Sequence, residues 1–291
     1  SLSKIATTIR PLGSLPGVSQ LAVVVAVIAG VVQGIVEWLP ISSQGNLAVV
    51  LTALGTDPAA ALRLALFLQV GTTLSAASYY WRDLLGVLRT VPSWRPDSAY
   101  ETEHALLSYL GVATLATGLV GVPLYLFVID LASALTGGAF VATIGVLLIL
   151  TGLLQLASDA TDAGRRDQPG LFDSLLVGAV QGVAILPGVS RSGVTAGALL
   201  FRRYEPPAAF RLSFILSIPA SLGAAAITMV DAGGVPAISP TTALVALGVS
   251  TVVGYLTIDA IMRVVDRIPF WAVCVGLGAL AVLGGGAVAL A

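Results

Sequence analysis

Long apolar stretches dominate the chain and set its predicted elements. Six of them are long enough to cross a bilayer as helices of about 20 residues; they lie near 60–81, 104–128, 138–157, 208–230, 241–262 and 268–290. Two further apolar regions, about 21–54 and 172–201, are each interrupted by a short polar turn, near 40–45 and 187–193. Short apolar arms joined by a polar turn are typical of re-entrant hairpins, so we expect two such hairpins beside the six spans.

The two interrupted regions are similar to each other at one constant offset. Residues 30–34 match 178–182, and residues 57–64 match 205–212, with Gln, Pro, Arg and acidic positions all aligned. We infer an internal duplication, with repeat one at about 18–157 and repeat two at about 172–291. Each repeat contains one hairpin and three spans, an odd number of crossings. The second repeat therefore starts on the opposite face, and the repeats are inverted.

The composition agrees with a location in the membrane. Only 10% of the 291 residues are charged and 57% are hydrophobic, whereas a soluble domain has about 25% charged residues. We therefore predict an all-α integral membrane protein, with a polar N-terminal segment at 1–17 and a single membrane domain at 18–291. The net charge of −1 and the scattered basic residues provide no track for a nucleic acid backbone.

The distribution of arginine predicts the orientation. The loops near 129–137 and 231–240 contain no Lys or Arg, and the opposite side has nine arginines: Arg82, Arg89, Arg95, Arg165, Arg166, Arg202, Arg203, Arg263 and Arg267. Because cytoplasmic loops are enriched in basic residues, the arginine-rich side should be cytoplasmic. Lys4 and Arg10 oppose this orientation but are outnumbered. The first hairpin then enters from the extracytoplasmic side.

Polar residues at the first hairpin are candidates for chemistry. Glu37 lies inside it, and a charged acid at membrane depth costs about 2.5–3.5 kcal/mol on insertion scales. We expect Glu37 to be a cation ligand or a proton-transfer group, with a structural ion pair or an interfacial acid as the alternative. Ser42 and Ser43 follow at the tip, where a serine can also be a backbone cap or a bond between helices.

The second hairpin has a basic tip. Arg191 lies between Ser190 and Ser192, and a guanidinium with hydroxyls at the start of a helix is typical of a phosphate site. The alternative is that Arg191 only ties the tip to Glu37. Ser43 and Arg191 occupy equivalent positions of the two repeats, so a pseudo-twofold axis would bring them together. The equivalent buried amides Gln33 and Gln181 are expected to bond each other across that axis.

The hairpin motifs resemble those of the undecaprenyl-pyrophosphate phosphatase family, membrane enzymes that cause bacitracin resistance when overproduced. Residues 30–46 and 186–195 are similar to its two motifs, and 69–71 and 211–219 to its flanking spans. The resemblance implies six spans with two re-entrant hairpins in the plasma membrane. It also implies a divalent cation, Mg²⁺ or Ca²⁺, and release of inorganic phosphate from a C55-type polyprenyl diphosphate, which recycles the lipid carrier for cell-envelope glycans.

The resemblance also assigns roles by position. Glu37, Ser43 and Arg191 match the family's acid, serine and phosphate-binding arginine, and Glu37 would also bind the cation. We expect the substrate-binding residues to be Gln33, Ser42, Asn46, Ser190, Ser192 and Thr195. However, the family usually has Glu in place of Gln33, His in place of Asn46 and Thr in place of Gln44. A His base at position 46 is thus excluded, which leaves Ser43 or a cation-bound water as the attacking group.

Two functions follow from these patterns. The leading hypothesis is a lipid diphosphate phosphatase. The alternative is a flippase or transporter of polyprenyl phosphate or a related anionic lipid, because opposed hairpins in inverted repeats are typical of transporters. The partners we expect are the polyprenyl diphosphate and membrane lipids, with no nucleic acid; a homodimer is left open.

Overall fold

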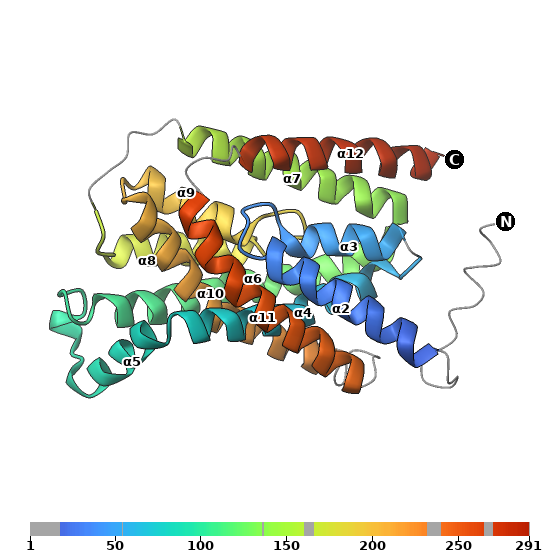
Figure 1. The fold of residues 1–291 in the computed structure, drawn as a ribbon. Coiled ribbons are helices and arrows are strands. Elements are labelled where there is room, and N and C mark those ends of the chain that lie inside the picture. The colour runs from blue at the N-terminus through green and yellow to red at the C-terminus, as the bar shows by residue number, and fades with distance from the viewer. Residues whose placement is uncertain are drawn as a thin grey trace.

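The computed structural model describes residues 18–53, 55–135, 137–159, 166–231, 240–264 and 270–290. Within these ranges the chain is helical, with no strand beyond one isolated bridge between Arg166 and Tyr204 (Figure 1). The all-α prediction is therefore confirmed for the described residues. The predicted polar segment 1–17 lies outside them.

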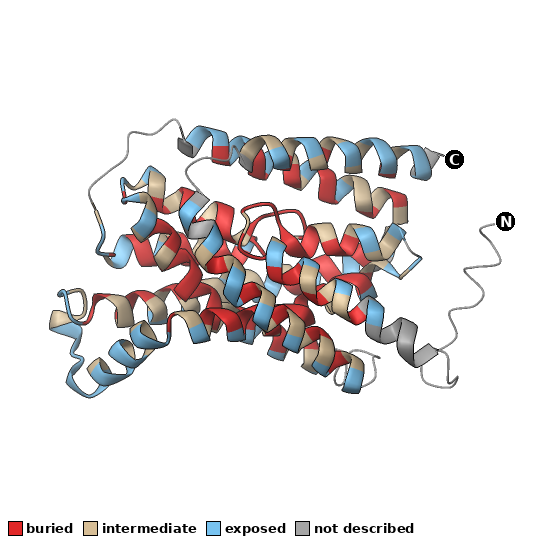
Figure 2. Cartoon of the chain, viewed as in Figure 1, coloured by how far each residue is buried: buried red, intermediate tan, exposed pale blue. Residues whose placement is uncertain are grey.

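Six helices are long and apolar enough to cross a membrane, and they coincide with the six predicted spans. They are α4 (Pro58–Tyr79), α6 (Ala105–Ala134), α7 (Gly137–Asp159), α10 (Pro206–Asp231), α11 (Pro240–Val264) and α12 (Phe270–Leu290). Figure 2 shows that buried residues concentrate on the inner helices, while α12 has a largely exposed outer surface. Large exposed apolar side chains, such as Leu119 on α6 and Leu283 on α12, suit contact with lipid.

Two pairs of helices form the predicted hairpins. The first pair is α2 (Val18–Val36) with α3 (Ser43–Ala53), and the second is α8 (Leu171–Val183) with α9 (Arg191–Phe201). In Figure 1 the two pairs come from opposite ends of the molecule, and their connecting turns meet in its middle. At 19 residues α2 is close to the length of a span, whereas α3, α8 and α9 have only 11, 13 and 11 residues. Re-entrant insertion therefore stays a prediction.

The turns lie slightly earlier in the chain than the sequence predicts. The second arm of each hairpin begins within the expected break, at Ser43 and at Arg191. The physical reason is capping: the Ser190 hydroxyl accepts a hydrogen bond from the Gly193 N–H, 3.2 Å away, and so starts α9. A serine cap satisfies one of the N–H groups that a helix start leaves without a partner.

Packing between the two halves is reciprocal. The first arm α2 packs on α11 of the second half, and the first arm α8 packs on α6 of the first half. The most extensive contact joins α7 to α12, which lie side by side along one flank (Figure 1). This exchange is what a twofold-related duplication produces. The opposite insertion of the repeats in a membrane stays a prediction, as does the division into domains.

One helix is absent from the predicted elements. α5 (Trp81–Thr90) has no buried residue, and short 3-10 turns follow it at Val91–Ser93 and Pro96–Ser98. Its apolar side chains Trp81, Leu85 and Leu88 are all exposed. Ten residues with two arginines and an aspartate do not resemble a span, so hydropathy alone predicts a charged loop for this segment.

Candidate active site

Glu37 is the centre of a hydrogen-bonded cluster formed by both hairpin tips. It directly follows α2 and is buried. Its Oε2 accepts hydrogen bonds from Gln33 Nε2 at 2.7 Å and from Ser43 Oγ at 2.5 Å. Its Oε1 forms an ion pair with the guanidinium of Arg191. The structure thus brings together the four residues to which the sequence assigns the acid, the serine, the arginine and the replaced glutamate.

The equivalence of Ser43 and Arg191 in the two repeats is visible in this geometry. Both begin the second arm of their hairpin, and both contact Glu37, one on each carboxylate oxygen. The two residues thus lie close together, on either side of one carboxylate, as expected; the pseudo-twofold axis itself stays a prediction. The proposed pairing of Gln33 with Gln181 is wrong, because Gln33 bonds Glu37 and Gln181 Nε2 donates to Thr117 Oγ1 at 3.1 Å.

A second helix holds the other side of Arg191. Its Nη1 donates to Ser221 Oγ and, at 3.4 Å, to the carbonyl oxygen of Ser217, both on α10. Ser221 in turn donates to Gln69 Oε1 on α4 at 3.5 Å. The guanidinium therefore bridges the first hairpin and the α10 span. Its position depends on three segments that are far apart in the sequence.

The Arg191–Glu37 pair is buried between the hairpin tips and α10. Side-chain exposure is 14% for Arg191 and 3% for Glu37. Removing one partner from a buried pair costs about 3–5 kcal/mol, because the other charge is left uncompensated. The alternative role of these two residues, an ion pair that ties the hairpin tips together, is present in the structure. It is compatible with phosphate binding, because a phosphate can replace the carboxylate on the same guanidinium.

Backbone contacts lock the two tips against each other. Ser42 has a left-handed backbone with φ of 61°, and its Oγ accepts hydrogen bonds from the Gly45 N–H at 3.3 Å and the Gly188 N–H at 3.1 Å. Gln44 Nε2 donates to the Ala184 carbonyl at 2.9 Å. A Cβ at Gly45 would lie 2.6 Å from Gly188 N, so the tips approach this closely only with glycine there. Ser42 is thus placed as a cap and a bridge between the hairpins.

Asn46 points its amide into its own turn. Its Nδ2 donates to the carbonyl oxygens of Ile41 at 2.7 Å and Ser42 at 2.9 Å. The side chain therefore closes the turn that carries Ser42 and Ser43. Its predicted contact with the substrate stays a prediction.

The hydroxyls around Arg191 differ in what they contact. Ser190 caps α9, and its Oγ lies 3.4 Å from Ser192 Oγ. Ser192 donates to the Leu39 carbonyl at 3.4 Å. Thr195 is fully buried, donates to the Arg191 carbonyl at 2.7 Å and lies 2.6 Å from Ser213 Oγ on α10. Ser190 and Ser192 line the same small pocket as Glu37 and Arg191, whereas Thr195 is not among its lining residues.

The pocket between the tips is nearly closed. Its free volume is about 10 Å³, which is space for about one water molecule. A diphosphate is much larger, so substrate binding requires the Arg191–Glu37 pair to separate or the tips to move apart.

The oxygen atoms in this pocket suit a hard divalent cation. Among the described residues, no three His, Cys, Asp or Glu side chains are grouped so that they could hold a metal ion. Nevertheless, the buried Oε1 atoms of Gln33 and Gln44 have no hydrogen-bond partner, and both side chains are next to or line the Glu37 pocket. Carboxylate and amide oxygens are the ligands that Mg²⁺ and Ca²⁺ prefer. The donor set therefore fits the expected cation, for which Glu37 would be the charged ligand; the cation itself stays a prediction.

The sequence analysis missed the residues that support Arg191 from the spans. Ser213, Ser217 and Ser221 recur every four residues on α10 and are all buried. That spacing places them on one helix face, and a stripe of hydroxyls in an apolar span was a readable signal. Gln69 is another buried polar residue within a span.

Comparison with known proteins places the chain in a family. The family model described as "Bacitracin resistance protein BacA" matches residues 26–281. The chain belongs to the BacA family. An undecaprenyl-diphosphatase from Haloarcula marismortui is 49% identical over 271 residues, which cover 92% of this chain and 99% of the relative.

Other relatives of this BacA-family chain bear the same name. An undecaprenyl-diphosphatase from Methanococcoides burtonii is 39% identical over 264 residues, which cover 89% of this chain and 96% of the relative. One from Saccharolobus islandicus is 37% identical over 249 residues, covering 83% of this chain and 87% of the relative. The predicted family resemblance is confirmed.

Proposed function

We propose that this chain hydrolyses a polyprenyl diphosphate of the undecaprenyl type, releasing inorganic phosphate and polyprenyl phosphate, and so recycles the lipid carrier for cell-envelope glycans. The observation that carries the proposal is the cluster of Glu37, Ser43 and Arg191 at the meeting point of the hairpin tips. It combines a carboxylate, a hydroxyl that donates to it and a guanidinium. The name shared by the relatives supports the same reaction.

Substrate binding begins at Arg191. The terminal phosphate would replace Glu37 on the guanidinium, because both are anions that a planar fork of N–H donors can bind. Ser221 keeps its hold on the other guanidinium nitrogen and so fixes the orientation of the fork. Ser190 and Ser192, which line the same pocket, would donate to the remaining phosphate oxygens.

Separation of the pair frees Glu37 to act as a base. Its Oε2 already accepts the Ser43 hydroxyl hydrogen, which is the arrangement of a base beside a nucleophile. Ser43 Oγ would attack the terminal phosphorus as its proton moves to Glu37. The bond from phosphorus to the bridging oxygen breaks, polyprenyl phosphate leaves, and water then hydrolyses the phosphoserine to inorganic phosphate. Direct attack by water held on Glu37 is the other route.

A divalent cation, Mg²⁺ or Ca²⁺, would neutralise charge on the phosphates when bound. Glu37 would be its anionic ligand, with the unpartnered Oε1 atoms of Gln33 and Gln44 as neutral ligands. The carboxylate would then have to serve both the cation and Ser43. Since Gln33 supplies no charge, we expect weaker cation binding here than in a site with two carboxylates.

We also propose a plasma-membrane location with the substrate reached from the extracytoplasmic side. The support is the distribution of charge: arginines occur on α5 and at the C-terminal ends of α9 and α11, which lie toward one end of the molecule (Figure 1). That end should be cytoplasmic. We further propose contact with membrane lipids, which the exposed apolar surface of the spans supports. Assembly into a homodimer stays a proposal as well. The names of the relatives favour hydrolysis over the transporter alternative.

Phosphate release from purified full-length protein tests the proposed function. The protein would be incubated with polyprenyl diphosphate and Mg²⁺ or Ca²⁺ at several pH values, beside Arg191→Ala as the control. We expect release that depends on Arg191 and on the cation. The absence of release above the Arg191→Ala control under all conditions would refute the proposal. A phosphoenzyme trapped with labelled substrate and absent from Ser43→Ala would identify Ser43 as the nucleophile.

A further inference from the structure

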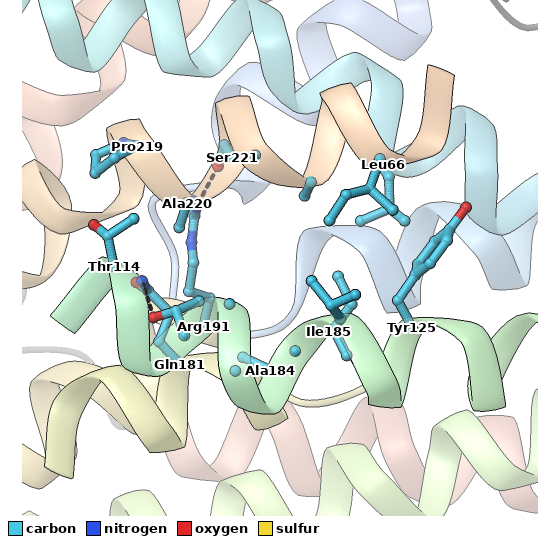
Figure 3. A pocket seen from close by; sticks show the side chains of 18 of the residues that line it. Leu66, Thr114, Tyr125, Gln181, Ala184, Ile185, Arg191, Pro219, Ala220 and Ser221 are labelled. Atoms are coloured by element: carbon cyan, nitrogen blue, oxygen red, sulfur yellow. Dashed lines mark hydrogen bonds between the residues drawn. The ribbon is translucent and has the colours of Figure 1, made fainter. Parts of the chain in front are cut away.

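A second cavity lies directly behind Arg191, between α6, α8 and α10. Its volume is about 130 Å³, and Figure 3 shows the side chains that line it. Arg191, Gln44 and Gln69 line both this cavity, which we name the slot, and the small pocket that contains Glu37. The slot therefore adjoins the candidate active site, and the guanidinium that would hold the phosphates lines both.

The slot is polar at one end and apolar at the other. In Figure 3, Arg191, Gln181 and Ser221 lie together at one end, whereas Leu66, Ile185 and Tyr125 line the other. At the polar end the Oε1 of Gln181 is buried and without a hydrogen-bond partner. A buried polar atom without a partner is costly unless water or a ligand satisfies it. This arrangement matches a ligand that is polar at one end and apolar at the other.

The slot opens toward the lipid-facing side of the bundle. Gly118 on α6 and Gly223 on α10 line it, and a Cβ at either would meet no atom within 4 Å. Gly223 is exposed, and Leu119, next to Gly118, has an exposed fraction of 79%. Both helices are candidate membrane spans. The opening between them therefore faces acyl chains when the spans are in a bilayer.

We propose that the slot holds the isoprene unit next to the diphosphate, and that the lipid substrate passes sideways from the bilayer between α6 and α10. This inference rests on the proposed function. The size agrees, because an apolar cavity of about 150 Å³ accepts benzene and an isoprene unit has a similar volume. The slot thus takes one such unit, and the remaining chain stays in the surrounding lipid.

The location explains how one side chain can serve both parts of the substrate. With the phosphates on Arg191, the first carbon atoms of the chain must leave the site along a surface that touches the guanidinium. The Glu37 pocket offers only about 10 Å³, whereas the slot offers about 130 Å³ on the other side of the same residue. Leu66, Ile185 and Ile227 also give the first isoprene unit surroundings as apolar as the lipid that it leaves.

Filling the slot tests the inference. Gly118→Leu and Gly223→Leu introduce a side chain into open space, so neither requires a backbone shift. Gly111→Leu is the matched control: Gly111 is also on α6, exposed and open, but does not line the slot. We expect kcat/KM for farnesyl diphosphate to fall at least about tenfold in both slot variants, because a poorly fitting hydrophobic group costs that much in a pocket. Gly111→Leu should retain the wild-type value.

A binding experiment separates the slot from the reaction. A prenyl diphosphate with a photoreactive group on its first isoprene unit would be cross-linked to full-length protein in vesicles, and the labelled peptides mapped. Labelling of α6 or α10 within 114–125 or 219–227, lost in Gly118→Leu, supports the slot. Labelling elsewhere, or slot variants that cleave farnesyl diphosphate as well as wild type, would overturn it. If wild type releases no phosphate, the proposed function fails, and the labelling pattern still decides on the slot.

Discussion

Replacing Gln33 by Glu perturbs the centre of the candidate site with a change of only one side-chain atom. In the wild-type structure, Gln33 Nε2 donates to Glu37 Oε2 at 2.7 Å. The Gln33→Glu variant removes this donor and puts a second carboxylate in its place. Both side chains are buried, at 1% and 5% exposure, so water can separate the two charges only poorly.

The expected magnitude follows from that geometry. Two like charges about 4 Å apart repel by about 4 kcal/mol at an effective dielectric constant of 20, and the lost hydrogen bond to a charged group adds about 1.5–3 kcal/mol. Arg191, already paired with Glu37, offsets part of this repulsion. We therefore expect the variant without cation to be destabilised by about 2–4 kcal/mol, which corresponds to roughly 5–10 °C in Tm. A divalent cation between the two carboxylates should reverse the loss.

Thermal unfolding in detergent, with EDTA or with Mg²⁺ or Ca²⁺, measures this effect. The control is Gln181→Glu, the equivalent position of the second repeat, whose amide donates to Thr117 rather than to a carboxylate. Gln33→Glu should gain more stability from the cation than wild type or Gln181→Glu does, and its phosphate release should require less cation. An unchanged Tm in EDTA, together with an unchanged response to cation, would refute the assignment of Glu37 and position 33 to a cation site.

Three further changes test the supports of the site and of the fold. Arg191→Lys keeps the charge but loses the planar fork, and kcat/KM for polyprenyl diphosphate should fall by about 10²-fold; a fall of less than threefold would argue against phosphate binding at Arg191. Ser221→Ala leaves a buried guanidinium N–H without its hydroxyl partner, which should raise KM several-fold and lower stability by about 1–2 kcal/mol, measured by steady-state kinetics and thermal unfolding; unchanged values would contradict the bridge to α10. Asp173→Asn should cost about 2 kcal/mol after allowance for exposed partners. Burial raises the pKa of Asp173, but hydrogen bonds from Arg202 and Tyr204 lower it more, so that its net pKa lies below the ordinary 3.8. The difference in the free energy of unfolding between wild type and Asp173→Asn should therefore be full above about pH 5 and shrink as the pH falls below 3.8. A difference that grows toward acid pH would contradict this sign.

Most of the fold could be predicted because its signals are local. A span is recognised by its own length and hydropathy, so each of the six predicted spans matches a helix of the structure. α5 escaped prediction for the same reason, since ten amphipathic residues have too little hydropathy for a span. The hairpin turns were placed a few residues late, because serine caps begin helices inside a segment that looks polar.

The candidate site was predictable only in part. Glu37 and Arg191 stand out because a charge in an apolar segment is costly and rare, and their contact agrees with the repeat argument. The sequence does not indicate which groups Asn46 and Thr195 bond. Both types of side chain can bond a substrate or the backbone, and in the structure their hydrogen bonds go to nearby backbone carbonyls and to Ser213.

The sequence by itself determined that this is a helical chain with six apolar spans, two interrupted apolar regions, and an acid and an arginine near the interruptions. These features depend on hydrophobic length and on the cost of burying charge, which each segment carries alone. Only the tertiary structure decided that Ser221 holds Arg191, that Gln33 bonds Glu37 rather than Gln181, and that a slot opens between α6 and α10. Those outcomes depend on how helices from distant parts of the chain pack. A cavity between such helices is lined by several segments, so the sequence of one segment cannot predict it.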